Sequence, residues 1–429
     1  MALFSARSFQ INNPAALGTG CGKCRLHKTC RSPKMEPYGD GSSGLMFIGE
    51  SPGDGEDKLN IPLVGMSGKM LDSYLRQEGI EPETIIKLNA VACRPPEARD
   101  PTGMEIEACR GRVFAAIEKY KPKVIVPLGM VALESLIGHR WPKKKDEKES
   151  GLGSMSRWFN WNIPDRQTKC WIIPNYHPAY ILRTRKENKD GSEPPNPAAE
   201  LWFETGIQNA VDHLSIQMPN FKDEESCVEI LTDDNKCAAL LQRIWAEEPF
   251  IVFDYEGSGL KPYRSGHRIW YIGIAYGPDS AICFPTQGMK KSLSIFRQMM
   301  SDPTLGKIAH NMMYEDLWTR ERLGVQVEGW VLDTIQSAHI IDQRPGITGL
   351  KFQTYVQSGL IDYSSHINEY LATPLNAAEA DMGANGFNRI SLAPPKQVMI
   401  YCGIDCIGTY RLAVHHAKLL DLGLKRGAK

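Results

Sequence analysis

The stretch LMFIGESPGDGED (residues 45–57) joins a short apolar run to a glycine-rich loop that contains a proline. An apolar run followed by turn residues is typical of a buried β-strand that ends in a loop. Glycine also lets backbone N–H groups come close to a small ligand. We therefore expect Glu50 to lie at the carboxyl end of a strand, where open α/β sheets place their ligand sites. The alternative interpretation is an ordinary strand-to-helix turn with acidic residues near the helix N-terminus.

Strand-like runs occur in two groups along the chain. The first group comprises residues 45–50, 124–129 and 170–177. The second group comprises residues 250–256, 268–276, 280–285 and 306–311. Helical patterns separate or follow these runs, for example at residues 104–120, 332–342 and 396–422. This alternation predicts an α/β fold, with a sheet and helices on its faces, in both halves of the chain.

A polar segment that contains proline, QMPNFKDEES (217–226), separates the two groups and is predicted to be a linker. Because 429 residues rarely form a single core, we expect two domains, at residues 1–216 and 227–429. With 50 basic and 50 acidic side chains the net charge is zero, which excludes a strongly basic protein that coats DNA. Local basic patches remain possible, and the runs at 139–148 and 183–189 are either such patches or solvated loops.

The sequence carries no sign of membrane insertion or export. No apolar run reaches the ~18 residues of a membrane span, and the N-terminal residues lack the continuous apolar core of a secretory signal. The chain has 11 cysteines, an odd number that fits a reducing compartment in which thiols are available to metals rather than to disulfides. We therefore expect a soluble protein of the cytoplasm with no membrane partner.

Cysteines are candidate metal ligands in the first half of the chain. Cys21 and Cys24 form a CxxC pair, and Cys93 and Cys109 lie far downstream. Four thiolates can bind zinc or an iron–sulfur cluster, and spacing alone does not decide between the two. Cys30 is a fifth candidate.

A histidine stands at the end of another predicted strand in the first half. In YHPAYIL (176–182), His177 precedes a proline and therefore has an extended backbone. A single histidine in such a place is more often structural than catalytic.

The order of motifs in the first half is more specific than any one of them. CxxC, GESPGxxED, IPLVGxSG, LNAVACRPP, a distant second cysteine, IVPLG and YHPAYIL follow one another between about residues 18 and 215. This order resembles the thermophile-type uracil-DNA glycosylases that carry a [4Fe–4S] cluster. The resemblance implies a structural cluster whose ligands are Cys21, Cys24, Cys93 and Cys109.

The same resemblance assigns roles in uracil excision. A glycosylase flips its base out of the stack and reads the Watson–Crick edge, and Asn89 can both donate to and accept from a uracil amide edge. His177 would stabilise the negative charge on the departing uracil. Glu50 would orient water or stabilise the sugar cation, and backbone groups at Ser51 and Gly53 would line the pocket.

The sequence departs from the family pattern in the motif IPLVG. The family has an aromatic residue that stacks on uracil where this chain has Leu63, and a glycine where it has Asn60. Base stacking on an aromatic ring is worth ~1–3 kcal/mol. Altered base preference, or a domain that only binds DNA, therefore stays open. Ile181 and Leu182 are either an apolar wedge that enters the duplex or core residues.

Acidic residues recur in three segments of the second half. Asp254 and Glu256 are two apart on a predicted strand and so point to the same face. AHNMMYED (309–316) follows, and Tyr401 and Asp405 are four apart on one face of a predicted helix. Like charges held close together are costly unless a cation lies between them.

This order of motifs resembles the 3′–5′ proofreading exonuclease domain of DNA polymerase I-type enzymes, which belongs to the DEDD superfamily and has a ribonuclease H-like fold. The resemblance covers residues 226–429. It implies that Asp254, Glu256 and Asp405 hold two divalent ions, Mg²⁺ or Mn²⁺, about 4 Å apart, and that Tyr401 hydrogen-bonds the attacking water.

One exonuclease position departs from its family. The family has aspartate where this chain has Glu315. Asp316 is the alternative ligand, but on a helix it would face elsewhere, so we expect Glu315 to be the one at the site. Asp333 is expected to begin a helix rather than to bind metal.

Together these features predict a DNA repair and replication enzyme that excises uracil and removes nucleotides from 3′ ends. The alternative is a proofreading accessory subunit of a separate DNA polymerase, whose first domain only binds DNA or a template uracil. No polymerase domain follows the last motif in this sequence. The two-domain order also resembles fused replication proteins of large bacteriophages, so a viral protein of the host cytoplasm is expected.

Overall fold

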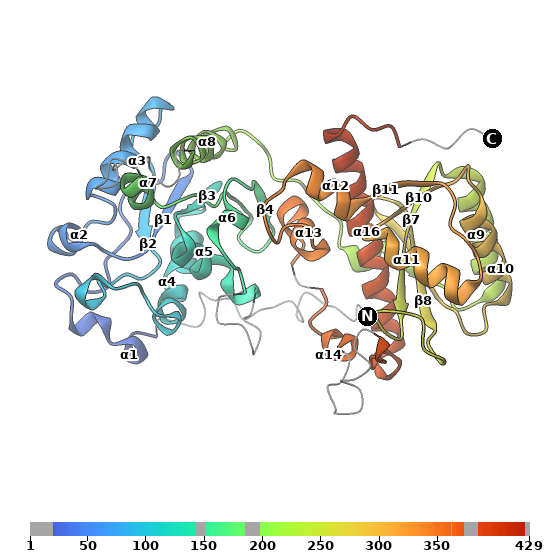
Figure 1. Cartoon of the computed structure of the whole chain (residues 1–429). Coiled ribbons are helices and arrows are strands. Elements are labelled where there is room, and N and C mark those ends of the chain that lie inside the picture. The colour runs from blue at the N-terminus through green and yellow to red at the C-terminus, as the bar shows by residue number, and fades with distance from the viewer. Residues whose placement is uncertain (1–19, 142–150, 185–197, 362, 373–384, 425–429) are drawn as a thin grey trace, which may run out of the picture. The chain divides into compact units, whose positions relative to one another are not determined.

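The computed structural model describes residues 20–141, 151–184, 198–361, 363–372 and 385–424. The chain forms two compact units (Figure 1). The first unit comprises residues up to Pro219 together with Tyr355–Ile361, and the second comprises residues 220–354 and those from 363 onward. The boundary between Pro219 and Asn220 lies inside the segment 217–226.

The first unit contains a five-stranded sheet with the order β2-β1-β3-β5-β4. Its strands are β1 (Leu45–Gly49), β2 (Ile86–Asn89), β3 (Val124–Pro127), β4 (Ile163–Asp165) and β5 (Cys170–Ile172). All neighbouring pairs are parallel except β4 with β5. Every residue of these strands is buried, which is expected of a parallel sheet covered on both faces.

Helices cover the first sheet. The longer ones are α3 (Met66–Gln77), α4 (Gly103–Tyr120), α5 (Met130–Ile137), α7 (Pro178–Thr184) and α8 (Ala199–Asp212). The shorter ones are α1 (Cys21–Cys24), η2 (Leu26–Lys28), α2 (Asp54–Leu59), η3 (Pro96–Ala98), η4 (Gly138–Arg140) and α6 (Met155–Trp158). Side chains from α3, α7 and α8 pack with Leu45 and Phe47 of β1 in one core cluster. The two βα loops that follow β1 and β5 therefore lie at one edge of a rigid sheet.

The second unit contains a six-stranded mixed sheet with the order β11-β10-β7-β8-β9-β6. Its strands are β6 (Val228–Ile230), β7 (Phe250–Gly257), β8 (Ile269–Gly277), β9 (Ser280–Pro285), β10 (Gly306–Ala309) and β11 (Trp330–Asp333). The central strands β7, β8 and β9 form an antiparallel meander, and β6, β10 and β11 each pair in parallel with a neighbour.

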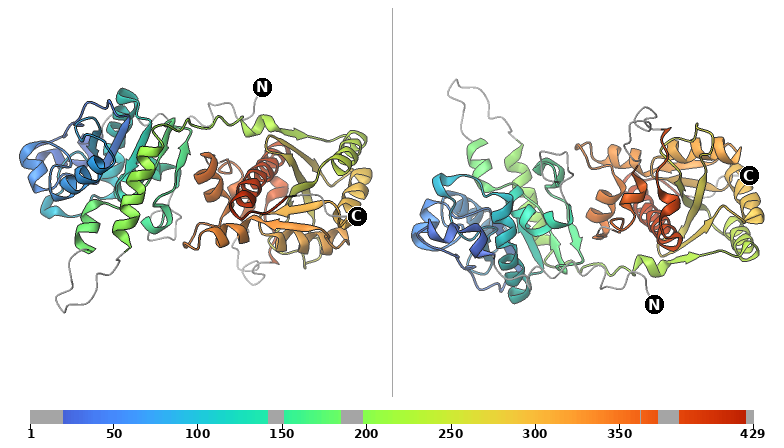
Figure 2. Two further views of the ribbon diagram at one scale, coloured as in Figure 1. Left: turned by 90° about the horizontal axis from the view of Figure 1, so that it is seen from above. Right: turned by 90° about the horizontal axis from the view of Figure 1, so that it is seen from below.

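Helices lie on both faces of the second sheet (Figure 2). The helices of the second unit are η5 (Glu224–Cys227), α9 (Asp234–Glu247), α10 (Lys290–Ser301), α11 (Met312–Trp318), η6 (Thr319–Leu323), α12 (Thr334–Ile341), α14 (Asn368–Leu371), η8 (Ile390–Leu392) and α16 (Pro395–Leu419). Helix α13 (Leu350–Ser358) begins in the second unit, and its residues from Tyr355 onward belong to the first. Phe253 and Tyr255 of β7 pack against α9 and α10, whereas Val252 packs against α16. Because side chains alternate along a strand, Asp254 and Glu256 share the α16 face with Val252.

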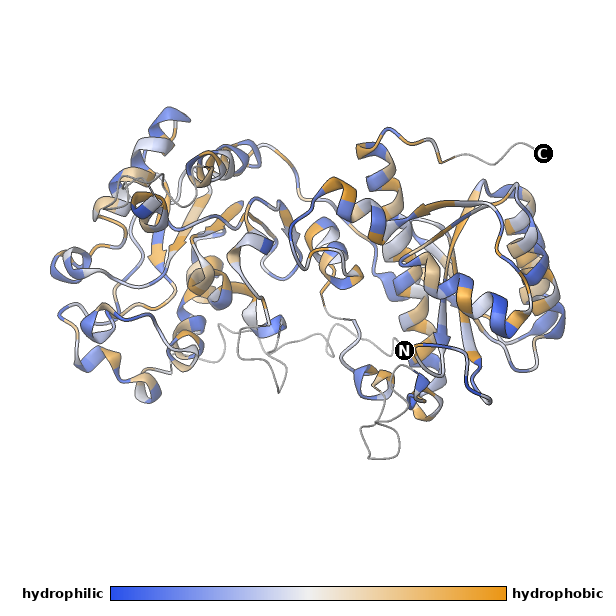
Figure 3. Ribbon diagram, in the orientation of Figure 1, coloured by the Kyte–Doolittle hydropathy of each residue, from blue (hydrophilic) through white to orange (hydrophobic). Residues whose placement is uncertain are grey.

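Apolar residues concentrate on the strands and on the inward sides of the helices (Figure 3). Within the described part of the chain, no helix is both long enough and apolar enough to cross a membrane.

Candidate active sites

The first candidate site lies where the parallel strands of the first sheet end. Glu50 follows β1, Asn89 is the last residue of β2 and His177 follows β5. Backbone hydrogen bonds continue past the strand ends, from Leu128 N to Ile48 O and from Gly129 N to Asn175 O. The structure therefore brings these three predicted residues to the same edge of one sheet.

Asn89 and Leu63 meet above Gly49. A Cβ atom on residue 49 would lie 2.5 Å from Asn89 Oδ1 and 3.1 Å from Leu63 Cδ2. Asn89 is 8% exposed, and its Nδ2 has no hydrogen-bond partner among the described residues. A buried donor without a partner is costly. The amide is thus free to donate to a carbonyl and to accept from an N–H, as recognition of a base edge requires.

Leu63 is held in place by its own backbone and by Glu56. Its φ is 52°, in the left-handed region that leucine rarely adopts, and its side chain is 2% exposed. The Glu56 carboxylate accepts hydrogen bonds from the backbone N–H groups of Gly53, Leu63 and Val64. Burial raises the pKa of Glu56, although these N–H groups oppose the rise. Glu56 fixes the loop that carries Leu63, a role that we did not predict from the sequence.

His177 has a defined tautomer. The backbone N–H of Ala179 donates a 3.1 Å hydrogen bond to Nδ1 of His177, so the single proton of the neutral ring lies on Nε2. Burial, helped by the positive charge of Arg183, lowers the pKa of His177 to about 4. The imidazole is therefore neutral at physiological pH and presents an Nε2–H donor. Gly129 lies beside the ring, where an added Cβ would be 3.4 Å from His177 Cβ.

Arg183 connects the two titratable groups of this site electrostatically. Burial raises the pKa of Glu50, the negative charge of Asp100 raises it further, and the positive charge of Arg183 opposes both effects. Arg183 is exposed, on α7, six residues after His177. In the sequence analysis Arg183 was only part of a basic run, and no role at this site was predicted for it. Residues 142–148 and 185–189 of the two predicted basic runs lie outside the described residues.

The two remaining pocket residues and the predicted wedge take different positions. Ser51 is half-buried and Gly53 is exposed. Ile181 is fully buried in the core cluster, and Leu182 packs against that cluster. Of the two interpretations left open by the sequence, the structure supports the core position for Ile181, which lies among the apolar residues that α7 packs against the sheet.

The four predicted cluster cysteines converge. Cys21 and Cys24 lie in α1, Cys93 follows β2, and Cys109 lies in α4. Burial, together with the charges of the other three thiols, raises the pKa of Cys109 to about 11. The set of donors fits a thiolate-bound cluster, because backbone N–H groups point at two of the sulfurs: Lys34 N donates to Cys93 Sγ at 3.2 Å, and Ala92 N donates to Cys109 Sγ. Cys30 contacts Cys93 and lies at the rim of the same group.

The second candidate site is a group of carboxylates on the α16 face of the second sheet. Asp254 and Glu256 extend from β7, Glu315 from α11 and Asp405 from α16. Burial raises the pKa of Asp254, Glu256 and Glu315. The Cys402 sulfur and the neighbouring carboxylates raise the pKa of Asp254 and Glu256 further, whereas a hydrogen bond with Asp254 opposes the rise at Glu315. Buried like charges of this kind are stabilised by a cation between them. An all-carboxylate set suits a hard divalent ion such as Mg²⁺.

Glu315 rather than Asp316 reaches the site. Glu315 is 1% exposed, hydrogen-bonds Asp254, and has an Oε2 atom without a partner among the described residues. Asp316 instead pairs with Arg320.

Asp333 acts as a cap for helices. Its carboxylate accepts from Ile335 N (3.0 Å) at the start of α12, and from Asn311 N (2.9 Å) and Met312 N (3.1 Å) at the start of α11. It thereby fixes the beginning of the helix that carries Glu315.

Asp405 is positioned by two phenols. Tyr363 donates a hydrogen bond to its carboxylate, and so does Tyr401. Burial raises the pKa of Asp405 to about 6, although Tyr363, Lys351 and Tyr401 oppose the rise. The Lys351 ammonium also lies 5.8 Å from the centre of the Tyr401 ring. Tyr363 and Lys351 were missed in the sequence, because neither belongs to the three acidic motifs.

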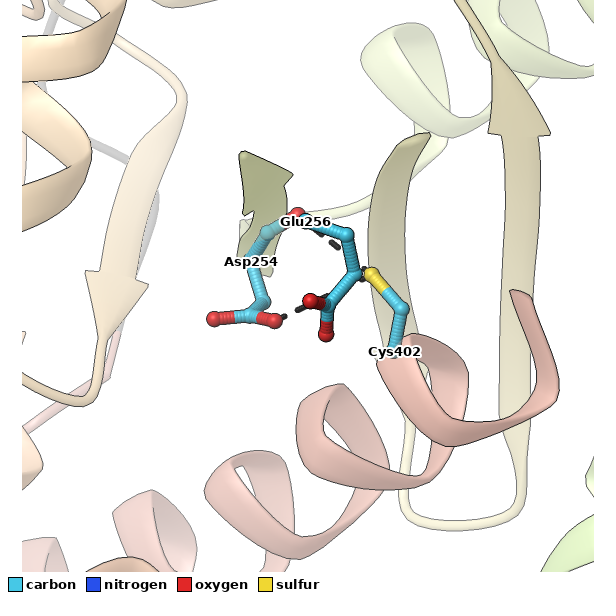
Figure 4. Close-up of side chains that lie close together, drawn as sticks. All are labelled: Asp254, Glu256 and Cys402. Atoms are coloured by element: carbon cyan, nitrogen blue, oxygen red, sulfur yellow. Dashed lines mark hydrogen bonds between the residues drawn. The ribbon is translucent and has the colours of Figure 1, made fainter. Parts of the chain in front are cut away.

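Asp254 and Glu256 also have a sulfur neighbour. Figure 4 shows their carboxylates beside the Cys402 side chain from α16, and one ligand atom of each residue lies within 4.8 Å of the other two.

Comparison with known proteins assigns a different family to each half of the chain. Residues 36–203 match the uracil DNA glycosylase superfamily, and residues 228–421 match the 3′-5′ exonuclease family. The type-4 uracil-DNA glycosylase of Thermotoga maritima is 36% identical over 165 residues, which are 38% of this chain and 79% of that protein. That of Saccharolobus solfataricus is 35% identical over 164 residues, or 38% of this chain and 72% of that protein.

A third relative spans both units. The DNA polymerase of Bacillus phage SP01 is 22% identical over 422 residues, which are 91% of this chain and 42% of that protein. The first unit thus has the uracil-DNA glycosylase fold and the second the ribonuclease H-like exonuclease fold. Through its first half the chain belongs to the uracil-DNA glycosylase superfamily, with type-4 enzymes as relatives, and its second half contains a 3′–5′ exonuclease domain.

Proposed function

We propose that this chain is a DNA enzyme with two active sites, one that excises uracil and one that removes nucleotides from 3′ ends. The observation that carries the proposal is that each unit gathers the reactive groups of its own family at one place. Asn89 and His177 lie at the strand ends of the first sheet, and four carboxylates from β7, α11 and α16 meet in the second unit.

Uracil excision would use the first site as follows. Asn89 Oδ1 accepts from the N3–H of a flipped uracil, and its Nδ2, which has no partner among the described residues, donates to the O4 carbonyl. The Nε2–H of neutral His177 donates to the negative charge that develops on the departing base. Glu50 orients water or stabilises the cationic sugar. Leu63 covers one face of the base without aromatic stacking.

The exonuclease site would hold two divalent ions on Asp254, Glu256, Glu315 and Asp405. When bound, these ions supply an activated water and stabilise the departing 3′ oxygen. The chain's own part is to fix the carboxylates and the water: Tyr363 holds Asp405, and the Tyr401 hydroxyl orients the attacking water from the same helix.

We propose a [4Fe–4S] cluster, with a structural role, on Cys21, Cys24, Cys93 and Cys109. Supporting it are the convergence of these thiols from α1, the segment after β2, and α4, and the N–H groups aimed at Cys93 and Cys109. Iron–sulfur sites use such hydrogen bonds to stabilise their thiolates.

A second candidate function is proofreading on behalf of a DNA polymerase encoded elsewhere, with a first unit that only binds DNA. Two observations favour it: the alignment with a phage DNA polymerase extends over both units, and Leu63 offers no ring to the base. A phage origin and work in the host cytoplasm would follow. Leu63→Phe discriminates between the two functions, because an added ring should increase uracil release by an enzyme and leave a pure binder without activity.

Variants that each remove one of the two activities test the main proposal. His177→Ala removes the Nε2–H donor, so it should reduce uracil release by ~10²–10³ and leave Mg²⁺-dependent 3′ shortening intact. Asp254→Asn should do the reverse. Loss of both activities in either variant, with folding preserved by circular dichroism, would contradict two independent sites.

A further inference from the structure

Three thiols form a group behind the exonuclease carboxylates. Cys283 lies on β9, Cys402 and Cys406 lie on α16, and all three side chains are fully buried. The register of the sheet places Asp254 opposite Gly273 and Gly273 opposite Cys283. Directly opposed residues share a face of the sheet, so Asp254 and Cys283 flank Gly273 beneath α16.

Gly273 leaves the room that these sulfurs occupy. A Cβ atom on residue 273 would lie 2.7 Å from Cys402 Sγ and 2.8 Å from Cys406 Sγ. Any larger residue would therefore push α16 and its thiols away from the sheet. The absence of a side chain brings Cys402 into contact with the acidic site.

Cys402 faces the carboxylates directly. Its Sγ lies 3.8 Å from Asp254 Oδ2 and 3.7 Å from the Asp254 backbone oxygen. Ligand atoms of Asp254, Glu256 and Cys402 all lie within 4.8 Å of one another (Figure 4). A second observation points to a ligand: Glu315 Oε2, in the same group, is buried without a partner among the described residues.

The chemistry of these donors differs from that of a magnesium site. Mg²⁺ takes oxygen ligands and gains nothing from a thiol, whereas Zn²⁺ and Cd²⁺ bind thiolate and carboxylate together, with Zn–S near 2.3 Å and Zn–O near 2.0–2.2 Å. We propose that Cys402, Asp254 and Glu256 form a binding site for a thiophilic divalent ion, and that its occupation shuts off the Mg²⁺-dependent exonuclease.

The inhibitory part of this inference rests on the proposed exonuclease function. Binding replaces the S–H bond of Cys402 with a metal–sulfur bond and releases the proton to solvent. Because the ion takes Asp254 and Glu256 as ligands, the catalytic Mg²⁺ ions lose two of their carboxylates. Free zinc would then act as a reversible brake on the removal of 3′ nucleotides.

Cadmium binding tests the site without any need for activity. The full chain, purified with its cluster cysteines occupied, is titrated with Cd²⁺, and the ultraviolet thiolate-to-cadmium charge-transfer band is recorded. Wild type should show a saturable band that Cys402→Ser lacks. Cys237→Ser is the matched control, because Cys237 is equally buried but packs in the core cluster on the other face of the sheet, and it should keep the band. Equal bands in wild type and Cys402→Ser would overturn the site.

Zinc inhibition tests the consequence. Against Mg²⁺-supported 3′ shortening, Cys402→Ser and Cys402→Ala should each need at least about tenfold more Zn²⁺ than wild type for half-inhibition, equivalent to about 1.4 kcal/mol. Unchanged sensitivity to Zn²⁺ in a folded Cys402 variant would overturn the proposed inhibition by zinc. If both variants misfold, X-ray absorption at the zinc edge is measured on wild-type protein whose cluster cysteines are already occupied. Zinc with both sulfur and oxygen ligands would support the site. Zinc with oxygen ligands alone would overturn it. A wild-type chain that binds Cd²⁺ but shortens no DNA would refute the exonuclease and not the metal site.

Discussion

The amide oxygen of Asn89 lies 2.5 Å from the point that a Cβ atom of residue 49 would occupy. Only glycine at the end of β1 therefore leaves the Asn89 amide in its observed position. The same point is 3.1 Å from Leu63 Cδ2. Position 49 therefore contacts both Asn89, which would read the base, and Leu63, which would cover it.

Gly49→Ala is expected to impair uracil excision by at least about tenfold with little change in the exonuclease. The methyl group displaces an amide that must keep its geometry to read a base edge. Single-turnover uracil release measures the effect, and Gly55→Ala, where an added Cβ meets nothing within 4 Å, is the control. Full activity in Gly49→Ala would show that Asn89 does not read the base from this position.

The His177 ring should stay neutral well below its usual titration range. Its folded pKa is about 4, lowered from 6.5 mainly by burial, so its labelled side-chain NMR signal, assigned with His177→Gln, should not shift between pH 8 and 5.5. Between pH 6.5 and 4 the unfolded chain binds more protons at this residue than the folded chain does. The contribution of His177 to stability is therefore complete above pH 6.5 and is lost as the pH falls through this window. A midpoint near 6.5 would contradict a buried, neutral donor.

Tyr363→Phe should weaken metal use by the exonuclease. It removes a hydrogen bond to the Asp405 carboxylate, and a bond to a charged group is worth about 1.5–3 kcal/mol. The Mg²⁺ concentration for half-maximal activity should rise by about ten- to a hundredfold. Tyr410→Phe is the matched control, since Tyr410 lies on α16, the helix that carries Asp405, but stacks on Phe250. Equal metal dependence of the two variants would remove Tyr363 from the site.

The proposed cluster should depend on Cys109 but not on Cys30. Cys109→Ser is expected to lose the broad visible absorption near 400 nm and the iron, because it removes a buried ligand that receives the Ala92 N–H. Cys30→Ser should keep both, since Cys30 lies at the rim beside Cys93. A colourless, zinc-containing wild type would overturn the cluster itself.

The sequence predicted helices and strands correctly where apolar residues formed a continuous run or a regular repeat. The apolar runs that begin at 45, 124, 170, 250, 268, 280 and 306 all contain strands, and the pattern at 396–422 is α16. Four strands escaped prediction because they are short or carry unfavourable residues: β2 contains Lys87, β4 contains Pro164, β6 has three residues, and β11 follows a turn. Burial of Lys87 depends on its pairing with Asp72, which no local pattern reveals.

The site could be predicted only as far as its motifs extended. Spacing predicted that Asp254 and Glu256 share a face of one strand and that Tyr401 and Asp405 share a face of one helix. The resemblance to the exonuclease domain linked the two motifs. Tyr363 and Lys351 lie in segments between motifs, and only the fold brings them to Asp405. Glu56 and Arg183 were hidden in the same way, since their roles depend on which backbone groups and charges the loops place beside them.

The central claim is that one chain carries two independent active sites, and one oligonucleotide tests it. A 5′-labelled single strand with one internal uracil is incubated with protein purified without oxygen, in EDTA or in Mg²⁺, and each sample is analysed with and without alkaline cleavage. We predict an alkali-dependent product at the uracil in EDTA, because glycosylase chemistry needs no added metal, and progressive 3′ shortening in Mg²⁺ alone. Shortening without any abasic site would contradict the claim and make the first unit a binding module.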